Sequence, residues 1–191
     1  MLSSPVRAWL LTGPPGIGKS TVVSRVIYLV RSAGYGVGGC LTKERRKGRE
    51  RTGFTIIDLM SGLEAPLASS EGSLGPRVGR YRVNVRGLAE IGANALREAA
   101  EGAEVIVIDE VGPMELTSPE FKRAAEACLK TTRPILAVVH DKMKDPLIDL
   151  IKALPDKELI EVTLHNREGL PQSLAKQILA RLPPHDGREA T

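Results

Sequence analysis

The stretch Gly13-Pro14-Pro15-Gly16-Ile17-Gly18-Lys19-Ser20 decides the fold. It has the spacing of a phosphate-binding loop, G-x-x-x-x-G-K-S/T, in which glycines let successive backbone N–H groups point at phosphate oxygens. The apolar run before it, residues 8–12, predicts a buried strand, and residues 19–32 carry apolar side chains at helical spacing. The positive end of that helix's dipole faces the loop. We therefore expect a P-loop in which Lys19 reaches the terminal phosphates and Ser20 binds Mg²⁺.

A second motif is the run Val105-Ile106-Val107-Ile108, which ends in Asp109 and Glu110. A continuous β-branched run is typical of a strand buried on both faces. Asp109 would then stand at the carboxyl end of a strand, where open α/β sheets bind ligands, and would hold Mg²⁺ through the metal's water shell. Glu110 is placed to orient and deprotonate a water that attacks the γ-phosphate. The alternative is that Glu110 caps the next segment or pairs with a base.

Two more polar side chains follow predicted strands. Gly112-Pro113 predicts a turn that brings Glu115 near the site, where we favour a solvated or salt-bridged carboxylate. His140 follows the apolar run 135–139 and either senses the γ-phosphate or is a hydrogen-bonded loop residue.

The remaining periodicities alternate between strands and helices. Further strands are expected at 36–42, 135–139 and, as the last core strand, 159–163; further helices are expected at 88–100, 118–129, 146–154 and 170–182. Strands separated by helices predict an α/β fold, with a mainly parallel sheet and helices on both faces. Residues 53–85 interrupt the alternation and read as an antiparallel hairpin excursion. We expect one domain over residues 1–182 and a polar tail over 183–191.

Composition excludes several classes of protein. The chain has 191 residues, of which 42% are hydrophobic, so it is long and apolar enough to fold as a globular domain. No apolar run approaches the ~20 residues of a membrane span, and the N-terminus lacks the pattern of a secretory signal, so a cytoplasmic protein with no membrane partner is expected. Cys40 and Cys128 are far apart and are expected to be reduced, and the histidines form no zinc-binding cluster.

The net charge of +4 resides in one segment. Residues 43–51 contain six bases and two acids, so the rest of the chain sums to zero. We expect this segment to be a loop that leaves the carboxyl end of the second strand, at the same edge as the P-loop. A guanidinium there could stabilise charge on the γ-phosphoryl group, and Arg46 is favoured for this role. The alternatives are a solvated loop or a nucleic-acid contact, which is disfavoured because no aromatic residues interleave with the bases.

Several stretches together resemble one family. These are residues 107–116, Thr42-Lys43-Glu44-Arg45-Arg46, Arg51-Thr52-Gly53-Phe54, Val78-Gly79-Arg80-Tyr81 and Asn166-Arg167. The family is that of the small nucleoside-triphosphatases of the thermophile type, also called cancer-related nucleoside triphosphatases. The resemblance implies a RecA-like P-loop core with an added strand and a catalytic Glu. It also implies Mg²⁺-dependent hydrolysis of ATP, GTP and other nucleoside triphosphates, with weak base selectivity. Pro113 and Arg80 depart from the family pattern, so neither is assigned a catalytic role.

The motifs and the resemblance together define the expected site. The catalytic residues would be Glu110, Lys19 and Arg46, and the metal ligands Ser20 and Asp109. Arg167 either stacks on the base or forms a structural salt bridge. The nucleotide-binding residues would be Gly13, Pro14, Pro15, Gly16, Ile17, Gly18, Lys19, Ser20, Thr21, Val105, Ile106, Val107, Ile108, Asp109, Glu110, Val111, Gly112 and Arg167.

Three functions fit these residues, and hydrolysis of nucleoside triphosphates fits best. A nucleoside or nucleotide kinase is the first alternative, but such kinases carry an Arg-rich lid, and residues 141–157 are short and contain no Arg. A module that contacts nucleic acid and uses the triphosphate as a switch is the second alternative, and it needs more accessory surface than this chain supplies. We expect a monomer that takes nucleoside triphosphates as substrate.

Overall fold

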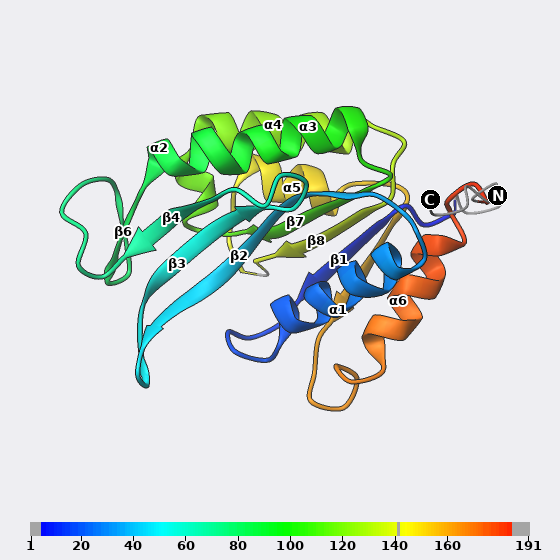
Figure 1. The fold of residues 1–191 in the computed structure, drawn as a ribbon, viewed down its shortest axis with the longest axis horizontal. Coiled ribbons are helices and arrows are strands. Elements are labelled where there is room, and N and C mark those ends of the chain that lie inside the picture. Colours follow the sequence, from blue (N-terminus) through cyan, green and yellow to red (C-terminus); the bar gives the residue numbers. More distant parts are fainter. Residues whose placement is uncertain (1–4, 141, 185–191) are drawn as a thin grey trace, which may run out of the picture.

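The computed structural model describes residues 5–140 and 142–184. Within them one mixed sheet forms the middle layer, and helices lie on both of its faces (Figure 1). The strands are β1 (Ala8–Thr12), β2 (Val37–Lys47), β3 (Glu50–Asp58), β4 (Glu64–Ser69), β5 (Arg77–Val78), β6 (Tyr81–Val83), β7 (Val105–Val111), β8 (Ile135–Val139) and β9 (Lys157–Glu161). Their order across the sheet is β5-β6-β4-β3-β2-β7-β8-β1-β9.

The helices divide between the two faces. They are α1 (Lys19–Ser32), α2 (Val85–Gly87), the π-helical turn η1 (Leu88–Ala93), α3 (Asn94–Gly102), the short 3₁₀ turn η2 (Glu115–Thr117), α4 (Pro119–Leu129), α5 (Pro146–Lys152) and α6 (Leu170–Leu179). Helices α1 and α6 lie on one face and α3, α4 and α5 on the other (Figure 1). Over the two described ranges, no helix is long and apolar enough to cross a membrane.

The parallel half of the sheet explains the long apolar runs of the sequence. Strands β2, β7, β8, β1 and β9 run parallel to one another, and every residue of β1 and β8 is buried. Successive side chains of a strand point to opposite faces. In β1, Ala8 and Leu10 join the core beneath α3–α5, while Trp9 and Leu11 join the core beneath α1 and α6. A strand covered by helices on both faces therefore has no polar side, which confirms the predicted α/β fold.

The strand order also fixes where a ligand can bind. Strand β8 lies between β1, which leads into the P-loop, and β7, which ends in the acidic pair. Because β1, β2, β7 and β8 are parallel, their carboxyl ends open toward one edge of the sheet. Ligands of open α/β sheets bind at that edge.

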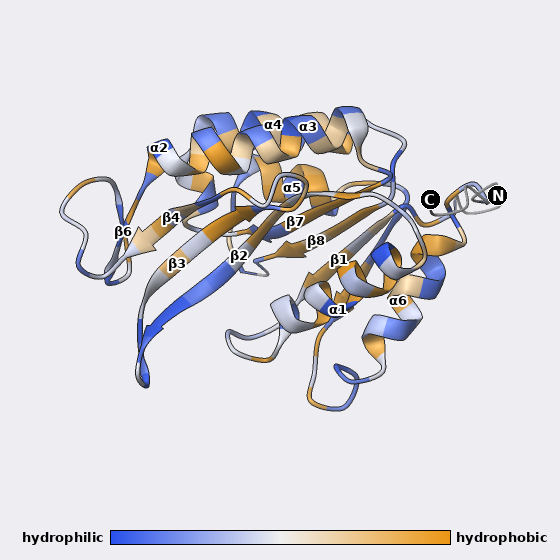
Figure 2. Ribbon diagram, in the orientation of Figure 1, coloured by the Kyte–Doolittle hydropathy of each residue, from blue (hydrophilic) through white to orange (hydrophobic). Residues whose placement is uncertain are grey.

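The basic segment is not the loop that we expected. Strand β2 continues past Thr42 to Lys47, turns at Gly48 (φ 63°) and returns as β3, so residues 43–51 form the end of a two-stranded antiparallel arm, called here the basic arm. The sequence signal missed this strand because its side chains are exposed and charged rather than alternating (Figure 2). Pairing with β3 satisfies the backbone without a hydrophobic face. The predicted excursion therefore begins earlier than residue 53 and includes β3, β4, β5 and β6.

Three smaller expectations also change. The last strand was expected as a core strand at 159–163. The structure places it two positions earlier, as β9, and β9 is an edge strand with no fully buried residue. The helix predicted at 88–100 consists of η1 and α3, and the short helix α2 precedes it. Of the predicted tail, residues 185–191 lie outside the described residues, while the Pro183 carbonyl accepts a hydrogen bond from the Tyr35 hydroxyl (2.8 Å).

Candidate active site

The P-loop connects β1 to α1 as a tight backbone curl. Gly13, Gly16 and Gly18 have φ values of 136°, 78° and 112°, in a region that other residues rarely adopt. Gly18 is the N-terminal cap of α1 and, having no side chain, makes no side-chain hydrogen bond to the first N–H groups of that helix. These N–H groups and the helix dipole form a site suited to anionic phosphate oxygens.

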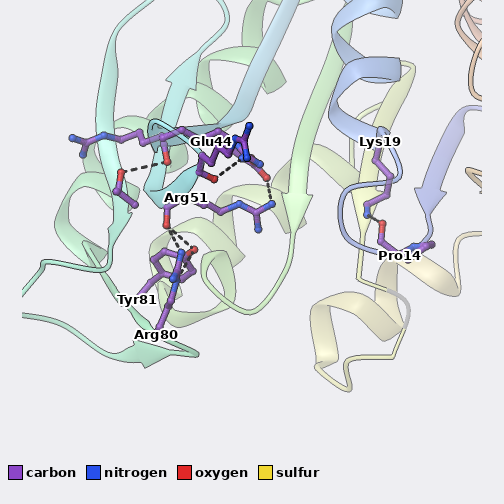
Figure 3. A network of polar contacts seen from close by, with 10 residues as sticks. Pro14, Lys19, Glu44, Arg51, Arg80 and Tyr81 are labelled. Carbon is purple, nitrogen blue, oxygen red and sulfur yellow. Dashed lines mark hydrogen bonds and ion pairs between the residues drawn. The ribbon is translucent and has the colours of Figure 1, made fainter.

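Lys19 lies across the mouth of this loop. Its Nζ donates hydrogen bonds to the carbonyl oxygens of Gly13 (2.8 Å) and Pro14 (3.1 Å), as Figure 3 shows for Pro14. Its charge also acts to lower the pKa of both Asp109 and Glu110, the acidic pair of β7. The expected position of Lys19 beside the terminal phosphates is thus compatible with the geometry.

Asp109 is buried at the end of β7, next to Leu41 of β2. Only 1% of its surface is exposed, and its Oδ2 has no hydrogen-bond partner in the described protein. Burial and the neighbouring Glu110 charge raise its pKa to about 7, although the Ser20 hydroxyl and Lys19 act in the opposite direction. A buried, unpartnered carboxylate oxygen beside a hydroxyl matches the oxygen donors that Mg²⁺ prefers.

Glu110 faces the cleft one residue further on, after a cis peptide bond that joins it to Asp109. Burial raises the pKa of its carboxyl, while the charges of Lys19 and His140 lower it. A side chain on Gly112 would collide with the Glu110 carboxylate, so the glycine leaves room for the carboxylate in this position. The two motifs that the sequence singled out thus meet at one place.

Glu115 is not the solvated or salt-bridged carboxylate that we favoured. It is 3% exposed, and no ion pair to it is found in the described residues. Its pKa lies well above the usual range, first because of burial and then because of the Glu110 charge, while its own N–H and that of Gly112 donate hydrogen bonds to it. Glu115, the first residue of η2, thus lies near Asp109 and Glu110, as the Gly112-Pro113 turn predicts, but it is buried rather than solvated or salt-bridged.

The basic arm forms the opposite wall. Glu44 accepts ion pairs from Arg46 (2.8 Å) and from Arg51, so one carboxylate is shared by two guanidiniums. The Arg46 side chain is 51% exposed and that of Arg51 32%. Arg51 extends from β3 toward the side on which Lys19 lies (Figure 3). Arg46 is the arginine that the sequence favours for the γ-phosphoryl group, and Arg51 is the more buried of the two bases that share Glu44.

One cleft of about 1440 Å³ joins these parts. Among the predicted site residues, those that line it are Gly13, Pro14, Pro15, Gly16, Gly18, Lys19, Ser20, Thr21, Arg46, Asp109 and Glu110. His140 and Glu115 line it as well. By contrast, the side chains of Val105, Ile106, Val107 and Ile108 are buried in the two cores, and Ile17, Val111, Gly112 and Arg167 are not part of the lining.

Arg167 supports the P-loop from outside the cleft. Its Nη1 donates to the Ile17 carbonyl (3.3 Å), and its Nε lies 3.6 Å from a Glu168 carboxylate oxygen. Asn166 closes the turn after β9 by accepting from the Thr163 N–H (2.8 Å) and donating to the Glu161 carbonyl (2.8 Å). The salt bridge expected as one alternative for Arg167 is therefore present, and base stacking stays a prediction.

Fold and site together define a P-loop nucleotide-binding protein with an added strand between the P-loop strand and the acidic strand. The NTPase family model matches residues 8–175. The chain therefore belongs to the nucleoside-triphosphatase family that the sequence motifs resemble.

Similar proteins agree with this assignment. The nucleoside-triphosphatase THEP1 of Thermofilum pendens is 44% identical over 89% of this chain and 94% of its own, and that of Methanosarcina acetivorans 42% identical over 90% and 97%. The crystal structure of THEP1 from Aquifex aeolicus superposes with a TM-score of 0.74 at 32% identity, covering 87% of this chain and 96% of that one. The solution structure of a human cancer-related nucleoside triphosphatase gives 0.78 at 33% identity, covering 92% and 98%.

Proposed function

We propose that this enzyme hydrolyses nucleoside 5′-triphosphates to the diphosphate and phosphate, with Mg²⁺ as its cofactor. The observation that carries the proposal is the meeting of Lys19, Asp109 and Glu110 in one cleft. A protein that only binds phosphate has no need of a second carboxylate beside the metal-side Asp109. The names of the similar proteins support hydrolysis of nucleoside triphosphates in general.

Glu110 is the proposed general base. A carboxylate can accept the proton of an attacking water most effectively when its pKa lies near the working pH. Burial moves the pKa of Glu110 in that direction, and the Lys19 and His140 charges limit the change. The proton of the water passes to Glu110 as the water oxygen attacks the γ-phosphorus and the bond from phosphorus to the β,γ-bridging oxygen breaks.

Ser20 and Asp109 are the proposed magnesium ligands. The described residues contain no group of three His, Cys, Asp or Glu side chains arranged to hold a metal ion alone. Mg²⁺ sites in nucleotide enzymes need no such group, because one or two carboxylates are completed by substrate phosphates and waters. When bound, the ion neutralises negative charge on the phosphates.

Arg46 is proposed to stabilise negative charge that develops on the γ-phosphoryl group. It lines the cleft, and its guanidinium is held by Glu44 through Nε (3.0 Å) and Nη2 (2.8 Å). Arg46→Ala is expected to slow single-turnover hydrolysis by ~10³, and Arg46→Lys to restore it only in part, because Lys lacks the planar fork. Equal rates for Arg46→Ala and the parent would remove Arg46 from the mechanism.

Phosphate release tests the whole proposal. ATP, GTP, CTP and UTP are each incubated with the enzyme and Mg²⁺, with EDTA as the matched condition, and with candidate acceptors or nucleic acid added in parallel. We expect Mg²⁺-dependent release from all four without any addition. Turnover that requires an acceptor would replace hydrolysis with the kinase alternative. The expected monomeric state and cytoplasmic location also stay predictions.

A further inference from the structure

The cleft continues past the residues that the proposed function uses. Its volume of about 1440 Å³ exceeds the roughly 300–1,000 Å³ of ordinary ligand pockets. One part, called here the P-loop half, is lined by residues 12–16 and 18–20 with Asp109 and Glu110. The other part, called here the arm half, is lined by Thr42, Arg51, Phe54, Ile57, Tyr81 and Met114. These residues come from β2, β3, β6 and the loop after β7.

Unpartnered polar atoms occur in both halves. In the two described ranges, four buried side-chain nitrogen or oxygen atoms have no hydrogen-bond partner: Thr12 Oγ1, Thr42 Oγ1, Arg51 Nε and Asp109 Oδ2. All four residues line this one cleft. Buried polar groups are normally paired, so an orphaned group calls for an explanation. Thr12 and Asp109 belong to the P-loop half, which leaves Thr42 and Arg51 unexplained.

The arm half carries excess positive charge in a fixed position. Glu44 is the carboxylate that pairs with both Arg46 and Arg51, so the two guanidiniums are only half neutralised. Arg51 is held from a second side by the Phe54 ring, whose centroid lies 5.6 Å from the guanidinium carbon. Its backbone carbonyl accepts hydrogen bonds from Arg80 and from the Tyr81 hydroxyl (Figure 3). The Arg51 guanidinium, with its Nε–H unused and the unpartnered Thr42 hydroxyl in the lining of the same cleft, suits the several acceptor oxygens of a phosphate group.

Beside this charge lies an apolar and aromatic surface. The rings of Phe54 and Tyr81 meet edge to face, with centroids 5.2 Å apart and an interplanar angle of 73°. Ile57 and Met114 extend the surface, and each of these four residues is only partly buried. The triphosphate chain in the P-loop half is anionic and does not bind through apolar contacts. A flat ring can bind to this surface, because it stacks on aromatic side chains.

We propose that the arm half is a second subsite, which binds a phosphate monoester with a flat ring, of the nucleoside monophosphate class, with its phosphate at Arg51 and Thr42 and its ring against Tyr81 and Phe54. The inference rests on the proposed function only in that the P-loop half takes the triphosphate. The subsite would be filled at the same time as the P-loop half, because its phosphate and its ring contact lining residues that the proposed triphosphate site does not use.

Calorimetric titration tests this subsite in two stages. The enzyme is first titrated with a non-hydrolysable ATP analogue and Mg²⁺, and a failure to bind at this stage contradicts the proposed function. AMP is then titrated into the analogue-saturated enzyme, beside adenosine and ribose 5-phosphate. We expect one equivalent of AMP to bind and each fragment to bind at least tenfold more weakly. No binding of AMP to the saturated enzyme, or displacement of the analogue by AMP, would overturn the second subsite.

Variants localise the binding. Arg51→Gln and Tyr81→Ala are each expected to weaken AMP at least tenfold while the affinity for the analogue changes less than twofold. Arg49→Gln is the matched control, because Arg49 is an exposed arginine of the same arm that does not line the cleft. It is expected to leave the AMP affinity within twofold. If Arg51→Gln weakens the analogue instead of AMP, or if Arg49→Gln weakens AMP as much as Arg51→Gln does, the assignment is wrong. Thermal unfolding of each variant shows whether it is folded.

Discussion

Replacing Asp109 by Asn should stabilise the ligand-free enzyme at neutral and alkaline pH. Asp109 is 1% exposed and has an unpartnered Oδ2, and its pKa is raised to about 7, chiefly by burial. An amide of the same shape removes the charge while leaving the packing nearly unchanged. The buried charge of Asp109 is thus expected to lower the free energy of unfolding of the ligand-free enzyme.

The pH dependence follows from the sign of this pKa change. Below about pH 3 the carboxyl is protonated in both the folded and the unfolded chain, so its ionisation costs nothing. As the pH rises toward 7, the unfolded chain ionises while Asp109 keeps its proton, and the free energy of unfolding falls. The gap between 3.8 and about 7 corresponds to about 4 kcal/mol at 1.36 kcal/mol per pKa unit, reached above pH 7.

Urea unfolding of parent and variant at pH 4, 6 and 8 measures this difference. We expect Asp109→Asn to gain little at pH 4 and up to about 4 kcal/mol at pH 8. Asp58→Asn is the matched control, because Asp58 is also buried but accepts hydrogen bonds from the Met60 N–H and the Ser61 hydroxyl. It should show no gain at pH 8. A gain for Asp109→Asn that is the same at all three pH values, or a loss at pH 8, would refute the reasoning.

Three further outcomes are expected. Lys19→Ala should abolish turnover and weaken triphosphate binding. Its free energy of unfolding should stay within about 1 kcal/mol of the parent, because the side chain belongs to the cleft and not to a core. Parent-like hydrolysis would refute the P-loop assignment. Gly112→Ala should lower the rate of single-turnover hydrolysis by up to about 10²-fold, because a methyl group at this position displaces the Glu110 carboxylate. Nucleotide affinity should be unchanged. An unchanged rate would show that this position of Glu110 is not the reactive one. Relative kcat/KM values for ATP, GTP, CTP and UTP should differ by less than about a thousandfold, or ~4 kcal/mol, because the sequence has no guanine-reading motif of the N-K-x-D type; a larger ratio would require a base-specific pocket.

The parts of the site that are local in sequence could be predicted from it. The P-loop is a continuous stretch whose glycines and Lys19 carry their own geometry, and helix α1 begins and ends at the residues expected. Asp109 and Glu110 follow an apolar run that is buried on both faces, so the pattern predicted that they lie at the carboxyl end of a core strand. In each case the signal and the structure lie within a few residues of one another.

The remaining parts depend on contacts between distant segments. The charged half of β2 becomes a strand only because β3 pairs with it, and no apolar alternation reveals that pairing. Glu115, the first residue of η2, is buried, whereas its type and its turn context predict exposure. The sequence pattern favours Arg46 over Arg51. In the structure both arginines pair with Glu44, but Arg51 also lies over the Phe54 ring, and its carbonyl accepts a hydrogen bond from Tyr81 of β6.

The most direct test of the account is Glu110→Gln, with nucleotide affinity and single-turnover hydrolysis measured on the same preparation. Gln keeps the size of the side chain but cannot accept the proton, while Ser20 and Asp109 are unchanged. We expect an affinity for Mg²⁺-ATP near that of the parent and hydrolysis slower by about 10²–10⁴. Parent-like hydrolysis would contradict the role of Glu110 as base, and lost affinity would place Glu110 among the metal ligands instead.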